Sequence, residues 1–311
     1  MSTPSGASAN RAARLPKAVC GIVILAQLGV LWAMSGGVDV GRKIVLGRTW
    51  PANELVSIDE IDHHAWDRLL RGHVDSEGNV DYGGWHADAA DLQALDAYLS
   101  TLSRANPRFE AGRDARLAFW INAYNALTIR GILREYPTSS IRNHTAWGWG
   151  FNMWRDLLLH VGDADYSLGQ IEHELLRPLN EPRIHFAIVC GSRGCPRLLN
   201  RAYQTTDLEQ QLGDNSRNFF ADPQKLEYDP ASGQLRLSPI LKWYAKDFGG
   251  SQAEMLKTIA PYLPEGVSRE LPARGKLRTD FMDYDWSLNE RPATDPEPPH
   301  PPLGDTDRIR E

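Results

Sequence analysis

The chain has 311 residues, which is long enough to bury a hydrophobic core and to form one large domain or two small ones. Hydrophobic residues make up 42 % and charged residues 24 % of the sequence, an ordinary globular composition. The net charge is −6, from 34 basic and 40 acidic residues that are mixed along the chain. Because no extended basic stripe is present, we expect no nucleic-acid partner.

The N-terminal region has the pattern of an export signal. Basic residues precede an uncharged apolar run from Ala18 to Met34, an order that keeps the N-terminus in the cytoplasm and sends the following chain across the membrane. The run is short for a spanning helix, which needs about 20 residues, and Ala33-Met34-Ser35 resembles a signal cleavage site. Residues 1–35 are therefore predicted to be a signal peptide or a membrane anchor. Either alternative places the protein in the cell envelope, anchored in the inner membrane and facing the periplasm, or secreted to the periplasm.

The first part of the chain after this segment is predicted to be mainly helical. Residues 36–54 are predicted to be a linker, and one globular domain is predicted to cover residues 55–289. Apolar residues at three- and four-residue spacing predict helices over 62–73 and around 92–99. A turn signal lies between them, at Glu77-Gly78-Asn79.

Residues 114–135 form the strongest predicted helix. Apolar side chains lie around most of its circumference, which is typical of a buried helix. Residues 141–156 are rich in Trp, Gly and Asn and are predicted to be an irregular loop. A capping box at residues 167–170 then predicts a helix that Pro178 ends.

The second half is predicted to combine helices with short strands. The apolar run 184–189 is typical of a buried strand, 207–220 of a helix, and 226–237 of a hairpin. Residues 290–311 are proline-rich and are predicted to be a disordered tail. The predicted fold class is α+β, a single domain with a buried central helix packed on a small, mainly antiparallel sheet.

Candidate catalytic groups gather at residues 183–196. Cys190 would be a nucleophile if a nearby base made it a thiolate, and the glycines at 191 and 194 would let backbone N–H groups form an oxyanion site. The candidate bases are His185 and His173. On a straight strand, His185 and Cys190 would point to opposite faces and lie about 16 Å apart, so His185 serves Cys190 only if the strand breaks.

Two buried amides are candidates for orienting the base. Asn122 and Asn125 are three residues apart and share one face of the central helix. One reading is that Asn122, or else Glu172, orients the histidine; the other is that both amides pin the loop at 141–156. The residues predicted to bind a ligand are Asn125, Arg177, Ser192, Arg193, Cys195 and Trp149.

The cysteine pair has a second interpretation. In an oxidising compartment, Cys190 and Cys195 would form a disulfide across the glycine loop, and Cys190 would then be no resting nucleophile. No metal site or cofactor is predicted, because no metal-binding or phosphate-binding motif occurs. The remaining candidate ligands, His63, His64 and His73, lie on or near a polar helix and are predicted to be solvated.

Several ordered motifs carry a family resemblance. They are VDSEGNVDY at 74–82, FWINAYNAL at 119–127, SLGQIEHELLR at 167–177, HFAIVCGSRGCP at 185–196, KWYAKDF at 242–248 and DYDWSLN at 283–289. Together they resemble the domain-of-unknown-function 547 family over roughly residues 60–289. The family has no assigned activity, and the resemblance implies a relation to papain- or transglutaminase-like folds and hence a cysteine-type site. In those folds the nucleophile opens the central helix, where this chain carries Trp120-Ile121-Asn122 and no cysteine.

Two functions remain as hypotheses. The first is a cysteine-dependent hydrolase or acyl transferase that acts on peptide, amide or thioester bonds. The second is a non-catalytic module that binds a peptide or glycan, in which Trp147, Trp149, Trp154 and the Cys190–Cys195 loop line a cleft. A redox or metal role of the cysteine pair is disfavoured by its C-x4-C spacing.

Overall fold

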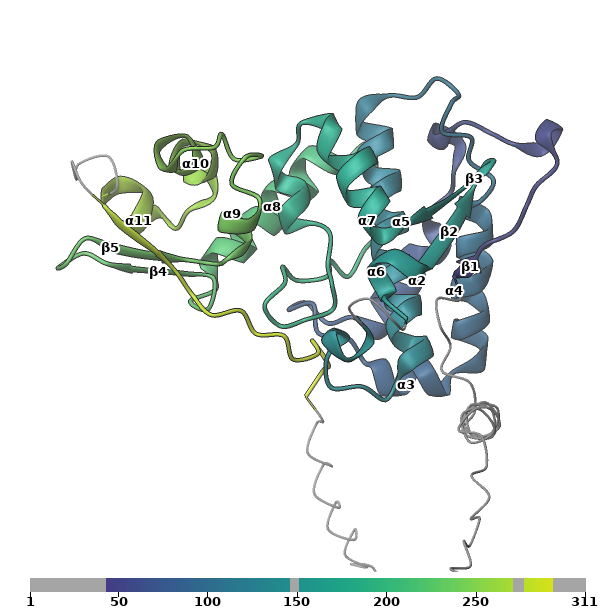
Figure 1. The fold of residues 1–311 in the computed structure, drawn as a ribbon, viewed down its shortest axis with the longest axis horizontal. Coiled ribbons are helices and arrows are strands. Elements are labelled where there is room, and N and C mark those ends of the chain that lie inside the picture. The colour runs from purple at the N-terminus through teal and green to yellow at the C-terminus, as the bar shows by residue number, and fades with distance from the viewer. Residues whose placement is uncertain (1–42, 146–150, 271–276, 293–311) are drawn as a thin grey trace, which may run out of the picture.

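A computed structural model describes residues 43–145, 151–270 and 277–292. Helices alternate irregularly with two small three-stranded sheets, which confirms the α+β class (Figure 1). The apolar run Ala18–Met34 lies outside the described residues, as does most of the predicted C-terminal tail. Within the described ranges, no helix combines the length and the apolar character that crossing a membrane requires.

The α-helices are α2 (His64–His73), α3 (Tyr82–Ala87), α4 (Ala89–Leu102), α5 (Arg113–Glu135), α6 (Met153–Asp156), α7 (Leu168–Gln170), α8 (Leu208–Ala221), α9 (Ile240–Trp243), α10 (Gln252–Ile259) and α11 (Glu265–Glu270). Short 3-10 turns are η1 (Ala52–Glu54), η2 (Ile58–Glu60), η3 (Ile141–His144), η5 (Arg177–Leu179), η6 (Pro182–Phe186) and η7 (Ala260–Tyr262), while η4 (Ile171–Leu176) is π-helical. The helices predicted at 62–73, 92–99, 114–135 and 207–220 are confirmed, and so is the capping box that opens α7.

Both sheets mix parallel and antiparallel pairs, so the predicted mainly antiparallel sheet is replaced by two mixed ones. In the first, β2 (Leu157–Val161) pairs in parallel with β1 (Ile44–Leu46) and antiparallel with β3 (Ala164–Ser167). In the second, β5 (Gln234–Leu237) pairs antiparallel with β4 (Leu226–Asp229) and parallel with β6 (Arg278–Phe281). The predicted hairpin is the β4–β5 pair.

The segment that was predicted as a linker contributes β1. Ile44 and Leu46 are half-buried and pack against the main core, whereas Val45 points outward and is exposed. This alternation is what an edge strand needs to cover one face of a core.

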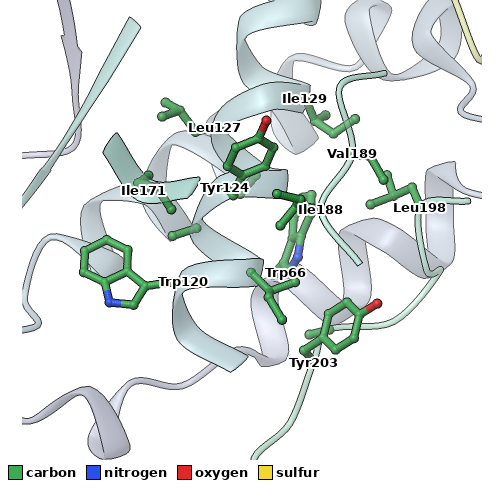
Figure 2. Close-up of a cluster of buried hydrophobic side chains, with 14 of the residues drawn as sticks. Trp66, Trp120, Tyr124, Leu127, Ile129, Ile171, Ile188, Val189, Leu198 and Tyr203 are labelled. Carbon is green, nitrogen blue, oxygen red and sulfur yellow. The ribbon is translucent and has the colours of Figure 1, made fainter. Parts of the chain in front are cut away.

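Helix α5 is the centre of the larger core. Its buried residues lie on every side, as predicted for an interior helix. Trp120, Tyr124 and Leu127 of this helix lie among Ile171, Ile188 and other buried side chains drawn from distant parts of the chain (Figure 2). A second core, which contains Phe186, Phe219 and Phe248, joins the η6 segment to α8 and to the second sheet.

The predicted strand at 184–189 is wrong. Its residues are buried, but they form the 3-10 turn η6 followed by an irregular segment. Some backbone groups of this segment bond within its own turn, and others bond to side-chain amides instead of a neighbouring strand. Asn215 Nδ2 donates to Phe186 O at 2.6 Å, and Asn125 bonds to Ala187 and Val189. An apolar run predicts burial, and buried backbone can be satisfied by amides as well as by a sheet.

The prediction of solvated histidines is wrong for two of the three. His63 is buried and its Nδ1 lies 2.7 Å from the hydroxyl of Tyr98. His73 stacks on Trp85 with ring centroids 4.5 Å apart and bonds to Asp91. Only His64 is exposed. Imidazole rings have large apolar faces, so they pack at helix interfaces when a polar partner is in reach.

Residues near the C-terminal end of the described chain pack against an earlier loop. Residues 285–289 run beside the loop at 191–194, with an antiparallel bridge between Ser192 and Leu288. This pairing places residues 285–289 beside the loop between Cys190 and Cys195.

Candidate active site

A pocket of about 230 Å³ opens beside the two cysteines. Aromatic side chains and the sulfur atoms dominate its wall, which consists of Tyr124, Trp154, Glu172, His185, Ile188, Cys190, Cys195, Pro196, Ile240, Trp243, Tyr244, Tyr284 and Trp286. A larger polar cavity of about 540 Å³ lies on the other side of Cys195, which belongs to both walls. The smaller pocket is the candidate active site, because it also contains His185, Glu172 and Cys190.

The sulfur atoms of Cys190 and Cys195 are in direct contact. Cys190 Sγ and Cys195 Sγ lie 2.6 Å apart, and both cysteines are free in this structure. Cys190 is half-buried and Cys195 is buried. Tyr284 supports the pair, since its hydroxyl donates to Cys195 Sγ at 3.1 Å and accepts from Ser192 at 3.1 Å.

Cys195 is the sulfur that the site stabilises as a thiolate. Burial by itself raises its pKa, but hydrogen bonds from the Cys190 thiol, the Tyr284 hydroxyl and the Cys190 backbone N–H outweigh this effect and lower the pKa to about 6. The N–H of Cys190 lies 3.0 Å from Cys195 Sγ. The hydrogen bond with Cys195, burial and the charge of Cys195, in this order, raise the pKa of Cys190. The pKa of Cys195 is thus lowered and that of Cys190 raised, so Cys195 is the first of the two sulfur atoms to lose its proton.

His185 lies in the same pocket, fixed by an acidic residue that the sequence did not reveal. Its Nε2 is 2.7 Å from Asp247 Oδ2, and its ring stacks on Tyr244 with centroids 3.9 Å apart. Asp247 is held in turn by two bonds from Arg177, at 2.6 and 2.8 Å. Burial lowers the pKa of His185, although Asp247 acts in the opposite direction, so the imidazole is neutral at pH 7.

Of the two predicted bases, His185 lines the pocket and His173 does not. His173 is half-exposed, accepts a bond from Arg177 Nη1 at 3.2 Å and does not line the pocket. Because residues 184–189 form no strand, His185 reaches the pocket that Cys190 also lines. Among the described residues, the side-chain hydrogen-bond partners of Cys190 Sγ are Cys195, Ser192 at 3.1 Å and Tyr284 at 3.5 Å, and no histidine is in bonding contact with it.

Among the described residues, the two buried amides bond to backbone groups and not to a histidine. Asn122 bonds the N–H and the carbonyl of Tyr203, at 2.9 and 2.8 Å. Asn125 donates to Ala187 O at 3.0 Å and accepts from the N–H of Val189 at 3.0 Å. Both amides thus have a structural role in the described part of the chain, where they hold the segments around 187–189 and 203.

Two of the backbone N–H groups expected to form the oxyanion site already donate to the chain itself. The N–H of Arg193 donates to Ser287 O at 2.8 Å, and that of Gly194 donates to Asp285 O at 2.7 Å. Gly191 has a φ of +79°, and an added Cβ would meet Ile132 Cδ1 at 2.3 Å. The glycines therefore serve the close approach of neighbouring segments.

The remaining predicted residues divide between the pocket and its surroundings. Glu172 and Cys195 line the pocket, Ser192 bonds to its wall, and the side chain of Arg193 turns away to Glu290 O. Trp149 and Trp147 lie outside the described residues, whereas Trp154 lines the pocket. In the described part of the chain, no group of three or more His, Cys, Asp or Glu side chains is arranged to hold a metal ion.

Sequence reasoning missed the residues that come from the far end of the chain. They are Asp247, Tyr244, Trp243, Tyr284 and Trp286, all of which lie in the blocks KWYAKDF and DYDWSLN. Both blocks carry the family resemblance, and their mixture of aromatic and acidic residues was the signal that could have assigned them to the site.

Comparison with known proteins supports that resemblance. Residues 109–220 match the family model described as "Protein of unknown function, DUF547". This stretch contains α5, the Glu172 segment and both cysteines. No curated protein and no solved structure matches the chain.

Proposed function

Residues 109–220 belong to the DUF547 family of proteins of unknown function, and from this premise we propose that the chain is a cysteine-dependent hydrolase or acyl transferase acting on peptide, amide or thioester bonds. One observation carries the proposal: the Cys190–Cys195 pair and an Asp247-held His185 line the same pocket. A thiol becomes a nucleophile when a nearby group can accept its proton. For the Cys190 thiol, that acceptor would be Cys195.

Cys190 is assigned the attack because it is the more exposed of the two sulfur atoms. Its sulfur forms a bond to the carbonyl carbon while its proton passes to the Cys195 thiolate. The bond from that carbon to the amine or thiol leaving group breaks, and the leaving group takes up the proton. Water then cleaves the resulting thioester, which releases a carboxylic acid and restores the Cys190 thiol. In a transferase, an acceptor amine or thiol takes the place of water.

The neutral His185 is assigned the activation of this water. A buried, uncharged imidazole can accept a proton, and Asp247 fixes its orientation and stabilises the imidazolium that forms. The suggested relation to papain-like folds would agree with a Cys-His-Asp set, although here the cysteines come from a loop and not from the start of α5.

The test uses p-nitrophenyl acetate, an activated acyl donor, on the full-length chain. We expect a burst of p-nitrophenol and one acetyl group on Cys190, located by mass spectrometry. Cys190→Ala should abolish the burst, and His185→Asn should slow deacylation by about 10²- to 10⁴-fold. Tyr98→Phe, a buried substitution in the α2–α4 region, should change neither. Quantitative disulfide bonding of Cys190 to Cys195 in the purified protein would refute the proposal, as would acetylation no faster than in the unfolded chain.

A second candidate function is the peptide- or glycan-binding module. The observation that favours it is the aromatic wall, in which Trp243 is 50 % exposed at the mouth of the pocket. This function predicts ligand binding that survives Cys190→Ala, whereas loss of all binding in a folded Cys190→Ala protein would contradict it.

We further propose that the domain works in the cell envelope, at the periplasmic face of the inner membrane or free in the periplasm. The support is the basic-then-apolar order before Ser35. Fusing alkaline phosphatase, which is active only after export, to the C-terminus tests this localisation, and an inactive fusion would contradict it.

A further inference from the structure

The pocket contains a buried carboxylate with one unsatisfied oxygen. Glu172 is 5 % exposed. Its Oε2 faces the hydroxyl of Tyr124 at 3.4 Å, and the hydroxyl of Tyr244 also interacts with this carboxylate. Oε1 is buried, and no donor of the described residues lies within hydrogen-bond geometry of it. Because an unpaired buried carboxylate oxygen is costly, its presence in a pocket wall indicates a donor that is supplied from outside. Glu172 also lies in the π-helical segment η4, a distortion that is frequent at functional sites.

The nearby basic side chains do not provide this donor. His173 Nδ1 stands 3.9 Å from Glu172 Oε1, beyond hydrogen-bond distance, and accepts from Arg177. The guanidinium of Arg177 is committed to both oxygens of Asp247. None of the residues that line the pocket, all of them in the described part of the chain, is Lys or Arg.

The rest of the wall suits a cation. Trp243, Tyr284 and Trp286 form a continuous aromatic surface, with ring centroids 4.9, 5.9 and 4.5 Å apart. Aromatic faces attract ammonium groups and also cover the methylene groups next to them. Cys195 lies in the same wall, and its lowered pKa favours a negative charge there.

The size of the pocket limits what it holds. Its volume of about 230 Å³ is below the range of about 300–1,000 Å³ that is usual for whole-ligand sites. It therefore suits one group of a substrate, of the size of an amino-acid side chain.

We propose that this pocket binds the primary ammonium group of the substrate, with Glu172 Oε1 accepting its N–H and the aromatic wall covering its alkyl chain. Together with the proposed function, on which this part rests, the substrate class is an acyl compound that carries an aliphatic amine. A primary ammonium is favoured over a quaternary one because Oε1 lacks a hydrogen-bond donor, which a quaternary nitrogen cannot supply.

The test is calorimetric titration of the full-length chain with n-butylammonium and with its neutral counterpart 1-butanol. The amine should bind at least about tenfold more tightly, and Glu172→Gln, which keeps the shape but removes the charge, should weaken amine binding by at least about tenfold. Glu174→Gln is the matched control, because Glu174 lies on the same segment but is exposed. The affinity of Glu174→Gln for n-butylammonium should stay within about twofold of that of the native chain.

Equal affinity for amine and alcohol would overturn the proposal, and so would full amine binding by Glu172→Gln. If Glu172→Gln fails to fold, Trp243→Ala replaces it. Trp243 is half-exposed, so its truncation should preserve the fold and still weaken amine binding. Measuring amine binding and p-nitrophenyl acetate turnover on the same native chain separates the two proposals. Amine binding without acyl transfer would refute only the catalytic function, and acyl transfer without amine binding would refute only the ammonium site.

Discussion

The hydroxyl of Tyr284 should control the charge of the cysteine pair. It donates to Cys195 Sγ at 3.1 Å, and Tyr284→Phe removes this donor while keeping the ring. A hydrogen bond to a charged group contributes about 1.5–3 kcal/mol, and a change of one in pKa corresponds to about 1.4 kcal/mol. The substitution should therefore raise the pKa of Cys195 by about 1 to 2, from about 6 to between about 7 and about 8.

The assay is the pH dependence of iodoacetamide alkylation, followed together with the ultraviolet absorbance of the thiolate. Reactivity of the native pair should rise as the pH passes through about 6, because the thiolate is the reactive form. In Tyr284→Phe the same rise should come at the higher pH, so alkylation between the two values becomes slower. Tyr98→Phe, whose hydroxyl contacts His63, is the control. An unchanged profile in Tyr284→Phe with the fold intact would refute the assignment of Cys195 as the stabilised thiolate.

Two further predictions concern the scaffold of the site. Asn125→Ala leaves one carbonyl and one N–H of the buried 187–189 segment without partners, which should destabilise the protein by at least about 2 kcal/mol in urea unfolding; a loss under about 0.5 kcal/mol would contradict this role. Gly191→Ala places a Cβ 2.3 Å from Ile132 Cδ1 at a φ of +79° and should destabilise by at least about 2 kcal/mol. Adding Ile132→Val removes the clashing methyl group, so it should restore the part of the stability that the clash costs, but not the part lost to the backbone conformation. If the double variant is no more stable than Gly191→Ala, the clash is unimportant.

Local patterns explain which parts of the fold could be predicted. The helix around Trp120 and Tyr124, the capping box at Ser167 and the β4–β5 hairpin follow from side-chain periodicity and turn residues, which act between near neighbours. The strand at 184–189 was predicted from the same kind of pattern and is wrong. Its hydrophobicity indicated burial correctly, but where a strand would supply backbone partners, the side-chain amides of Asn125 and Asn215, far away in the sequence, supply them.

The sequence alone determined that an apolar segment precedes a domain of mixed helices and strands, and that the family motifs occur in order. It also showed two cysteines on either side of a glycine-containing loop. Only the tertiary structure decided which sulfur is stabilised as the thiolate, because Tyr284 reaches Cys195 from 89 residues away. It also placed Asp247 against His185 and left one oxygen of Glu172 open in an aromatic pocket. The physical reason is that charge, desolvation and hydrogen bonding depend on neighbours in space, whereas the patterns in a sequence report mainly on neighbours along the chain.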